Sequence, residues 1–334
     1  MLPLIKDGTV VITAGSMITG GFLVESAKSI MAGETAGRTW FYIAFAVGVL
    51  LVVVGFVWRW STQRRTQVGI VVVAADTPSL ARMREQQAED FSTNEYVLTL
   101  KAAIDLPVDT ARRVELMTQL VEETQHAIAT ADRLTPHAAR VNVIATMRLH
   151  IAFWFGARIG HTHSRETAIF SLRQGNGTPA FFHATSLRTE QRRARSRLDV
   201  AVLETIAGGD STRVALALDL QNFGDSFRDR VLDDCRARGF GALLMLRNPN
   251  ETLPENKAVF TDVVDQVCRV WRETQLPAGA RSGQHAIYLS GPVSIALALG
   301  ARLAAADQGR WTPLSYNTVT GTYESFPPAP QPTP

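Results

Sequence analysis

The feature that most constrains this 334-residue chain is an uncharged apolar run, Trp40–Trp58, near its N-terminus. Its 19 residues, WFYIAFAVGVLLVVVGFVW, approach the roughly 20 that an α-helix needs to cross about 30 Å of hydrocarbon. Tryptophans at both ends match the aromatic belt that forms where a membrane meets water. The run therefore predicts a transmembrane helix over about residues 40–58.

A weaker apolar segment, Thr9–Val24, precedes this run. A cleaved signal peptide is the alternative, but Pro3 and Asp7 dilute the basic start that such peptides have. We therefore expect another transmembrane helix over about residues 9–30, and a membrane anchor that extends to residue 66.

Basic residues predict the orientation of this anchor. Arg59, Arg64 and Arg65 directly follow the second span, whereas the short loop between the spans carries Glu34 and Arg38. Because Lys and Arg gather on the cytoplasmic side of a membrane, both termini are expected in the cytoplasm.

The first span carries small and polar residues on one face. Thr9, Thr13, Ser16 and Gly20 are spaced at i, i+4, i+7 and i+11, which places them along one side of a helix. Close helix packing through small residues explains this pattern. The alternative is a weakly polar stripe that lines a shared path once several subunits gather.

After residue 67 the pattern changes to short β-branched runs alternating with amphipathic helices, which is typical of a parallel sheet with crossover helices. The sequence therefore predicts an α/β domain. Strands are expected over Val68–Ala74, Tyr96–Ile104, Val141–Thr146, Thr167–Leu172 and Ala180–His183. Helices are expected over Pro78–Asp90, Ala111–Ala131 and Arg148–Ile159.

The same order of elements then returns. Strands are expected over Arg213–Leu220, Gly241–Arg247, His285–Ser290, Trp311–Asn317 and Thr322–Phe326, and helices over Phe223–Arg238, Asn256–Thr274 and Pro292–Ala305. A shift of 144 residues superposes the two copies without a gap, and places Gly156-Ala157-Arg158-Ile159 on Gly300-Ala301-Arg302-Leu303. An internal duplication follows, with one unit over residues 67–185 and the other over 212–326.

The connector between the units, residues 186–211, is predicted to be a basic helix that ends at Gly208-Gly209. A solvated face explains its charges, and help with an anionic ligand or with lipid headgroups is the alternative. Its arginines are Arg188, Arg192, Arg193, Arg195 and Arg197. The proline-rich tail, residues 327–334, is expected to be disordered.

Charge and cysteine content exclude several classes of protein. A net charge of +3 argues against a general coat for DNA or RNA duplexes but leaves room for a local anion site. Cys235 and Cys268 lie in predicted helices without CxxC spacing, so buried thiols in a reducing compartment are expected.

The motifs of common catalytic sites are missing from the sequence. No GxGxxG fingerprint follows either first strand, and neither GxxxxGK[ST] nor GxSxG occurs. His161 and His163 form an HxH pair without a well-placed third ligand. We therefore assign no catalytic residue, no metal and no cofactor.

Open parallel sheets bind ligands at the carboxyl ends of their strands, where helix N-termini offer free N–H groups that suit phosphate. Four loops meet this description: Ala75–Ser79, Thr146–His150, Leu220–Ser226 and Ser290–Ser294. The candidate ligand-binding residues are Asp76, Thr77, Thr146, Met147, Arg148, Gln221, Asn222, Phe223, Arg247, Ser290, Gly291 and Pro292.

One segment and two single residues among these candidates can be interpreted with or without a ligand. Ser290-Gly291-Pro292 is typical of a helix start with a hydroxyl N-cap, which needs no ligand. Arg148 occupies the matching place in the first copy, where a cation opposes the helix dipole, so a phosphate contact explains it better. Phe223 is either a core residue or a side chain that stacks on a base.

One segment connects these features to a known family. LSGPVSIALALGARL, followed by a strand pair that ends in GTYESF, lies within two fused Rossmann-like units and resembles the SAVED domain. That domain is a fusion of two units similar to CRISPR-associated Rossmann-fold (CARF) sensors. The resemblance covers residues 67–326, and its best motif is Tyr288–Leu303. With two leading membrane helices, the chain resembles the membrane-spanning SAVED effectors of cyclic-oligonucleotide-based antiphage signalling (CBASS).

The resemblance implies a receptor and not an enzyme. A cyclic di- or trinucleotide would bind between the two units, SAVED domains would self-associate, and the membrane helices would disrupt the lipid bilayer of the bacterial inner membrane, which kills the infected cell. Two other classes stay open. One is a membrane-tethered nucleotide-processing enzyme such as a ring nuclease, and the other is a membrane scaffold that binds no ligand.

Overall fold

The computed structural model divides the chain into two compact units, Met1–Gln67 and Val68–Pro334. It describes residues 16, 38–64, 67–75, 78–107, 109–136, 138, 140–161, 163, 165–173, 180–188 and 195–327. The expected first transmembrane helix therefore lies outside the described residues, except for Ser16, and so does the tail after Pro327.

The described part of the first unit is one long helix, α2 (Arg38–Arg64), so the structure confirms a helix over the apolar run Trp40–Trp58. Its described side chains extend from Ile43 to Val57, Ala44 excepted. Several of them are exposed apolar groups, among them Leu50 and Phe56 at 62% and 66%. Within the residues that the structure describes, no helix meets the length and apolar character needed to cross a bilayer. The membrane anchor and its orientation stay predictions.

The second unit begins with a five-stranded sheet in the order β2-β1-β3-β4-β5, in which all neighbours are parallel except β4 and β5. Its strands are β1 (Val68–Ala75), β2 (Leu98–Asp105), β3 (Arg140–Thr146), β4 (Glu166–Leu172) and β5 (Phe181–Ser186). The helices that connect them are α3 (Pro78–Glu95), α4 (Thr110–Leu134) and α5 (Leu149–Ile159).

A seven-stranded sheet follows in the order β12-β11-β10-β8-β9-β6, and β7 also pairs with β9. Its strands are β6 (Asp199–Val200), β7 (Glu204–Thr205), β8 (Asp210–Asp219), β9 (Phe240–Arg247), β10 (His285–Ser290), β11 (Trp311–Asn317) and β12 (Thr322–Ser325). Its helices are α6 (Asp225–Ala237), α7 (Lys257–Glu273) and α8 (Val293–Leu299).

The two sheets share one topology, because the order β9-β8-β10-β11-β12 repeats β2-β1-β3-β4-β5. The last residues of β1 and β8, Ala75 and Asp219, are 144 residues apart, and so are Thr146 and Ser290 at the ends of β3 and β10. In both sheets the final strand runs antiparallel to its neighbour. The predicted α/β class is confirmed, as two Rossmann-like sheets that repeat along the chain.

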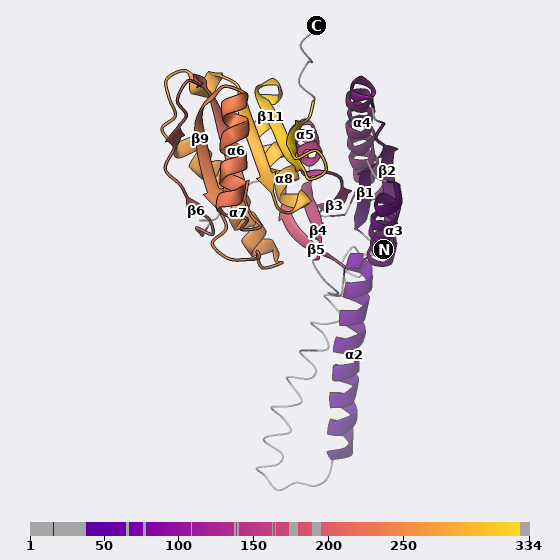
Figure 1. Ribbon diagram of the computed structural model, residues 1–334. Helices are drawn as coiled ribbons and strands as arrows, with labels where there is room; N and C mark the ends of the chain where they lie inside the picture. The colour runs from indigo at the N-terminus through magenta and orange to yellow at the C-terminus, as the bar shows by residue number, and fades with distance from the viewer. Residues whose placement is uncertain are drawn as a thin grey trace. The chain divides into compact units, whose positions relative to one another are not determined.

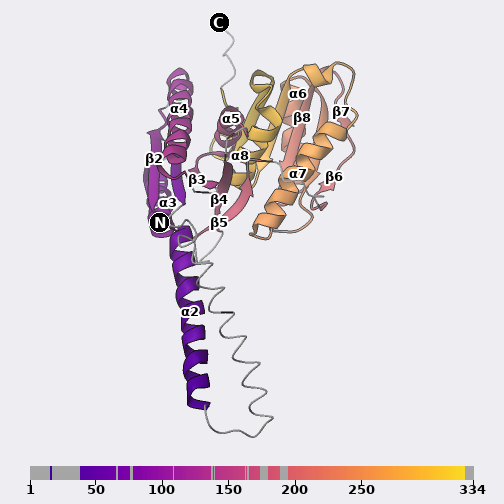
Figure 2. The same ribbon diagram turned by 180° about the vertical axis from the view of Figure 1, so that it is seen from behind.

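Alternation along the central strands builds a layered core. In β8, Leu216 belongs to the large central cluster with residues of α7 and α8, whereas Ala217 packs with residues of α6 on the other face. In β1, Val72 likewise joins the central cluster and Val73 joins a separate cluster with Ala88 of α3. Figures 1 and 2 show α6 and α7 on opposite faces of the second sheet, with α5 and α8 between the two sheets.

The two halves of this unit meet where α5 crosses α8. An ideal Cβ on Gly156 would lie 2.0 Å from the carbonyl oxygen of Leu297, and one on Gly300 would lie 1.9 Å from that of Phe153. Both glycines and both carbonyls are 144 residues apart, so the contact is reciprocal. Glycine at these two places lets the helix backbones touch, and a pseudo-two-fold axis passes between them.

The predicted connector helix is wrong for residues 195–207, where β6 and β7 pair with the edge of β9. The side chain of Gln266 on α7 explains why. Its Oε1 accepts hydrogen bonds from the backbone N–H groups of Arg197 and Leu198 at 2.6 and 2.9 Å, and its Nε2 donates to the Leu198 carbonyl at 2.7 Å. These bonds satisfy backbone groups in an extended chain that a helix would otherwise satisfy. Residues 189–194 of the prediction lie outside the described residues.

Candidate functional site

A groove with two lobes lies at the carboxyl ends of β3 and β10, where α5 and α8 begin. Lobe one has a volume of about 380 Å³ and lobe two about 470 Å³, which is the size range of small-molecule sites. The lobes share a common wall, so we treat them as one groove. The shared lining residues are Arg84, Thr146, Met147, Gly291 and Val293.

The two lobes are related by the internal repeat. Lobe one lies between β4, which contributes Ser171 and Leu172, and the loop that follows β8. Lobe two lies between β11, which contributes Ser315 and Tyr316, and the end of β1. Ser171 and Ser315 are 144 residues apart, and so are Leu172 and Tyr316. The groove therefore extends across the pseudo-two-fold axis, and both halves of the repeat contribute to it.

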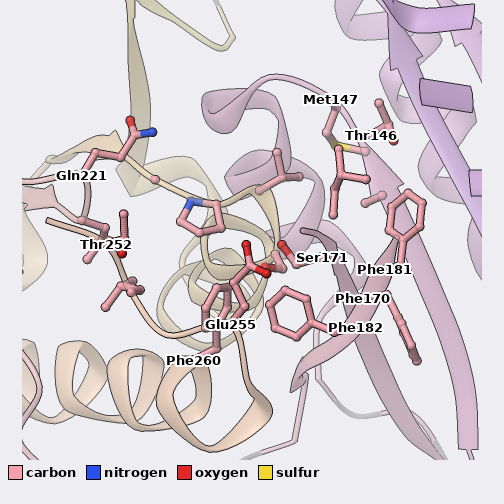
Figure 3. Close-up of a pocket in the computed structure, with 18 of the residues that line it drawn as sticks. Thr146, Met147, Phe170, Ser171, Phe181, Phe182, Gln221, Thr252, Glu255 and Phe260 are labelled. Carbon is pink, nitrogen blue, oxygen red and sulfur yellow. The ribbon is translucent and has the colours of Figure 1, made fainter. Parts of the chain in front are cut away.

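Lobe one combines aromatic faces with a few polar groups (Figure 3). Hydroxyl, amide and carboxylate groups come from Ser171, Thr252, Gln221 and Glu255. The aromatic side chains are Phe170, Phe181, Phe182, Phe223 and Phe260. Such a cavity suits a flat heteroaromatic ring, because the phenyl groups pack on its faces and the polar groups bond to its edge.

Loop Gln221–Phe223 is held rigidly by Asp219, which is fully buried. The Asp219 carboxylate accepts hydrogen bonds from the backbone N–H groups of Phe223 and Gly224 at 3.0 and 2.8 Å. Asn222 has a φ of 54°, and its Oδ1 accepts from Arg247 Nε at 2.8 Å. Phe223 is 52% exposed and lines lobe one, so of its two interpretations the core role is wrong.

Segment Ser290–Pro292 differs from its predicted role as a hydroxyl cap. The N-cap of α8 is Pro292, with no side-chain hydrogen bond to the cap, and Ser290 lies two residues too early. Its Oγ instead donates to Gln221 Oε1 at 3.2 Å. Gly291 has a φ of 142°, and an ideal Cβ there would lie 2.8 Å from the Cβ of Leu220. Glycine is therefore required at this place, where the backbone borders both lobes.

Arg148 lines lobe two and is the N-cap residue of α5. Its Nη1 forms an ion pair with Glu324 Oε2 at 2.9 Å, and the side chains are 41% and 36% exposed. Glu324 belongs to β12 of the second half, so this pair joins the two halves beside the groove. The proposed phosphate contact of Arg148 stays a prediction.

Arg84 is a groove residue that the sequence did not indicate. It lies on α3, is exposed and lines both lobes. The residue 144 positions later, Arg228 on α6, instead forms an ion pair with Glu204 at 2.8 Å. An arginine on an amphipathic helix resembles any solvated charge, so no sequence signal separates these two.

The structure brings most of the predicted ligand-binding residues to the groove. Arg247, Asn222 and Ser290 line neither lobe. Arg247 bonds to Asn222, and Ser290 bonds to the lining residue Gln221. Asp76 and Thr77 lie outside the described residues. Those that line the lobes are Thr146, Met147, Arg148, Gln221, Phe223, Gly291 and Pro292.

Among the described residues, no group of three or more His, Cys, Asp or Glu could hold a metal ion. His161 Nδ1 lies 3.0 Å from the carbonyl oxygen of Ala301. Both cysteines are free and buried, as predicted, and burial raises the pKa of Cys235 to about 12 and that of Cys268 to about 11.

Comparison with known proteins finds no matching family model and no matching characterised sequence. Among solved structures, the Acinetobacter baumannii Cap4 SAVED/CARF-domain containing receptor with the cyclic trinucleotide 2′3′3′-cAAA aligns with a TM-score of 0.44 and 12% identity, over 84% of this chain and 55% of that one. The same receptor with 3′3′3′-cAAA gives 0.41 and 10%, over 95% and 76%. The Moraxella osloensis Cap4 receptor gives 0.36 and 10%, over 95% and 75%. The chain thus spans about half the length of the first of these receptors.

Proposed function

We propose that this chain is a SAVED-type receptor of antiphage defence that binds a cyclic oligonucleotide in the two-lobed groove. The observation that carries the proposal is the position of the groove. It extends across the pseudo-two-fold axis, at strand ends and helix starts of both halves, where the sequence resemblance places the ligand. A cyclic oligonucleotide needs such a site, because its bases project from a ring of phosphates and sugars toward different walls.

The chemistry of the groove agrees with that of the ligand. Arg84 and Arg148 supply guanidinium groups, which bind phosphate through several N–H donors in a fixed plane. Lobe one supplies phenyl faces for a base, and the amide of Gln221 can bond to the edge of that base. Neither feature needs a metal or a cofactor.

A direct binding screen tests this proposal. The full chain, purified in a mild detergent because α2 exposes apolar side chains, would be titrated by calorimetry with cyclic di- and trinucleotides of adenine, guanine and uracil. We expect at least one ring to bind with a salt-sensitive affinity, and the linear trinucleotide of the same bases to bind more weakly. No binding by any ring would refute the proposal.

We propose a receptor and not an enzyme, since the groove holds no group that the sequence marks as catalytic. The competing hypothesis is a ring nuclease. Incubating the full chain with a labelled cyclic trinucleotide separates the two. If the ring stays intact during an incubation much longer than binding requires, the receptor is supported. If linear product accumulates, the nuclease is supported.

For the N-terminal part we propose a membrane anchor. The uncharged run Trp40–Trp58 and the exposed apolar side chains of α2 support it. If Arg59, Arg64 and Arg65 set the orientation, a reporter fused after Pro334 stays cytoplasmic. An exported reporter would contradict both the topology and the antiphage role, because the cyclic nucleotide is made in the cytoplasm.

The effector step that we propose is ligand-driven gathering of subunits, followed by damage to the membrane. A ligand shifts an equilibrium only through its different affinities for the two states, so contacts between ligand-bound receptor units must supply the energy. Liposomes that carry the purified chain should leak dye only when the cyclic oligonucleotide is present. Replacing Thr13 and Ser16 by leucine should preserve binding and reduce leakage. Equal leakage without any cyclic oligonucleotide would rule out this gated step.

A further inference from the structure

The ion pair between Arg148 and Glu324 is the starting point, because it occupies one of the two guanidinium groups that the described part of the chain brings to the groove. Arg148 Nη1 lies 2.9 Å from Glu324 Oε2. The other carboxylate oxygen, Oε1, accepts a hydrogen bond from Asn317 Nδ2 at 2.6 Å. Arg148 and Asn317 both line lobe two, so the carboxylate of Glu324 binds two polar side chains of that lobe at once.

The place of Arg148 explains why a carboxylate is needed there. It is the N-cap residue of α5, where free backbone N–H groups carry a partial positive charge that a cation makes larger. Glu324 offsets this charge in the ligand-free protein. A phosphate group offers the same kind of oxygen ligand with equal or greater charge, and it competes for the same N–H donors.

Two features separate this contact from an ordinary surface ion pair. It joins residues 176 positions apart in the two halves of the repeat, and the residue that follows β12, Phe326, is 2% exposed and packs on Trp154 of α5 with ring centroids 5.0 Å apart. The backbone beside Glu324 is thus anchored against the first half, which keeps the Glu324 carboxylate within reach of Arg148.

We propose that Glu324 is an internal competitor for the phosphate of the ligand, which must take Arg148 from this carboxylate in order to bind, so that Glu324 sets the ligand concentration at which the groove fills. This inference rests on the proposed function. It predicts that in the ligand-free protein the Glu324 carboxylate neutralises the charge of Arg148 in lobe two. It also predicts that other small phosphates at low concentration do not displace this carboxylate from Arg148.

The test replaces Glu324 by glutamine, which keeps the size of the side chain and an oxygen that accepts from Asn317. The cyclic di- or trinucleotide that binds most tightly in the screen would be titrated into the full chain, and its affinity would be compared between the wild type and the variant. We expect roughly a three- to fivefold gain in affinity, the scale of one partly exposed charge interaction. A matched control is Glu204→Gln, since the Glu204–Arg228 pair has a similar distance, 2.8 Å, and similar side-chain exposures, 37% and 44%, but lies outside the groove lining.

A double-mutant cycle identifies the cause of the gain. If Glu324 acts by competing for Arg148, Glu324→Gln should improve binding in the otherwise wild-type chain and not in a chain that also carries Arg148→Ala. An affinity that falls, that stays unchanged, or that rises equally in Glu204→Gln and Glu324→Gln would overturn the inference. Failure of the wild type and all variants to bind any ring would instead refute the proposed function, so the two failures are distinct.

Discussion

Replacing Gly156 by alanine should force the two halves of the repeat apart. The added Cβ would lie 2.0 Å from the carbonyl oxygen of Leu297 and 2.8 Å from its carbonyl carbon. Non-bonded heavy atoms approach to about 3.5 Å without repulsion, so α5 and α8 must separate by roughly 1.5 Å. The atoms in the way are backbone atoms, which have no other rotamer to adopt.

The expected cost follows from two opposing contributions. Overpacking of this kind costs about 3 kcal/mol, the upper end of the usual range, because no side chain can yield. Alanine gains about 1 kcal/mol over glycine in a helix interior, which leaves a net loss of about 2 kcal/mol. For a unit of this size, that loss lowers the melting temperature by roughly 4–8 °C.

Thermal unfolding of the full chain, followed by circular dichroism, would measure this change. Gly300→Ala should behave alike, because its Cβ would lie 1.9 Å from the carbonyl oxygen of Phe153. The double variant should lose less than the sum, since one separation relieves both clashes. Gly309→Ala is the control, because its Cβ would meet nothing within 4 Å. A melting temperature within 1 °C of the wild type in both single variants would refute the reciprocal contact.

Two further predictions concern the groove and its surroundings. Arg148→Ala should weaken binding of the cyclic oligonucleotide by about 1.5–3 kcal/mol, the value of a charge-assisted hydrogen bond, and Asn222→Ala and Ser290→Ala should weaken it less; calorimetry that finds all three unchanged would place the ligand at other loops. Burial, with the nearby charges of Arg148 and Arg113, lowers the pKa of His150 to about 3. Because the unfolded state binds the proton more tightly, stability should fall as the pH drops from about 6.5 toward 3. His150→Leu should flatten this dependence in melting curves recorded between pH 7 and 4, and an identical slope in both proteins would contradict it.

Local patterns in the sequence were sufficient to predict the elements of the repeat. The run Val68–Ala75 is buried along its whole length, as expected for a central strand covered by helices on both faces. The start of α5 lies within one residue of its predicted place. Such predictions succeed because hydrophobic periodicity and β-branched composition report the burial of each residue directly.

Residues that the repeat made equivalent differ in what they do. Arg158 and Arg302 occupy the same place in the two copies, but the Arg158 guanidinium lies over the Trp154 ring at 4.0 Å. The Arg302 side chain is only 4% exposed, forms an ion pair with Asp265 and donates a hydrogen bond to the Ser186 carbonyl at 2.7 Å. Sequence alignment of the copies cannot distinguish these roles, because each depends on which chain segment passes beside the helix.

The sequence by itself determined the order of strands and helices within each copy of the repeat, the duplication and the end of the sheets at which a ligand site should form. Only the tertiary structure decided the composition of that site. Arg84 joins it from α3, Glu324 reaches Arg148 from the far end of the chain, and Gln266 holds the connector extended. The physical reason is that periodicity encodes how each segment buries its own face, whereas these contacts join residues that are distant in sequence and arise only when the two halves pack around Gly156 and Gly300.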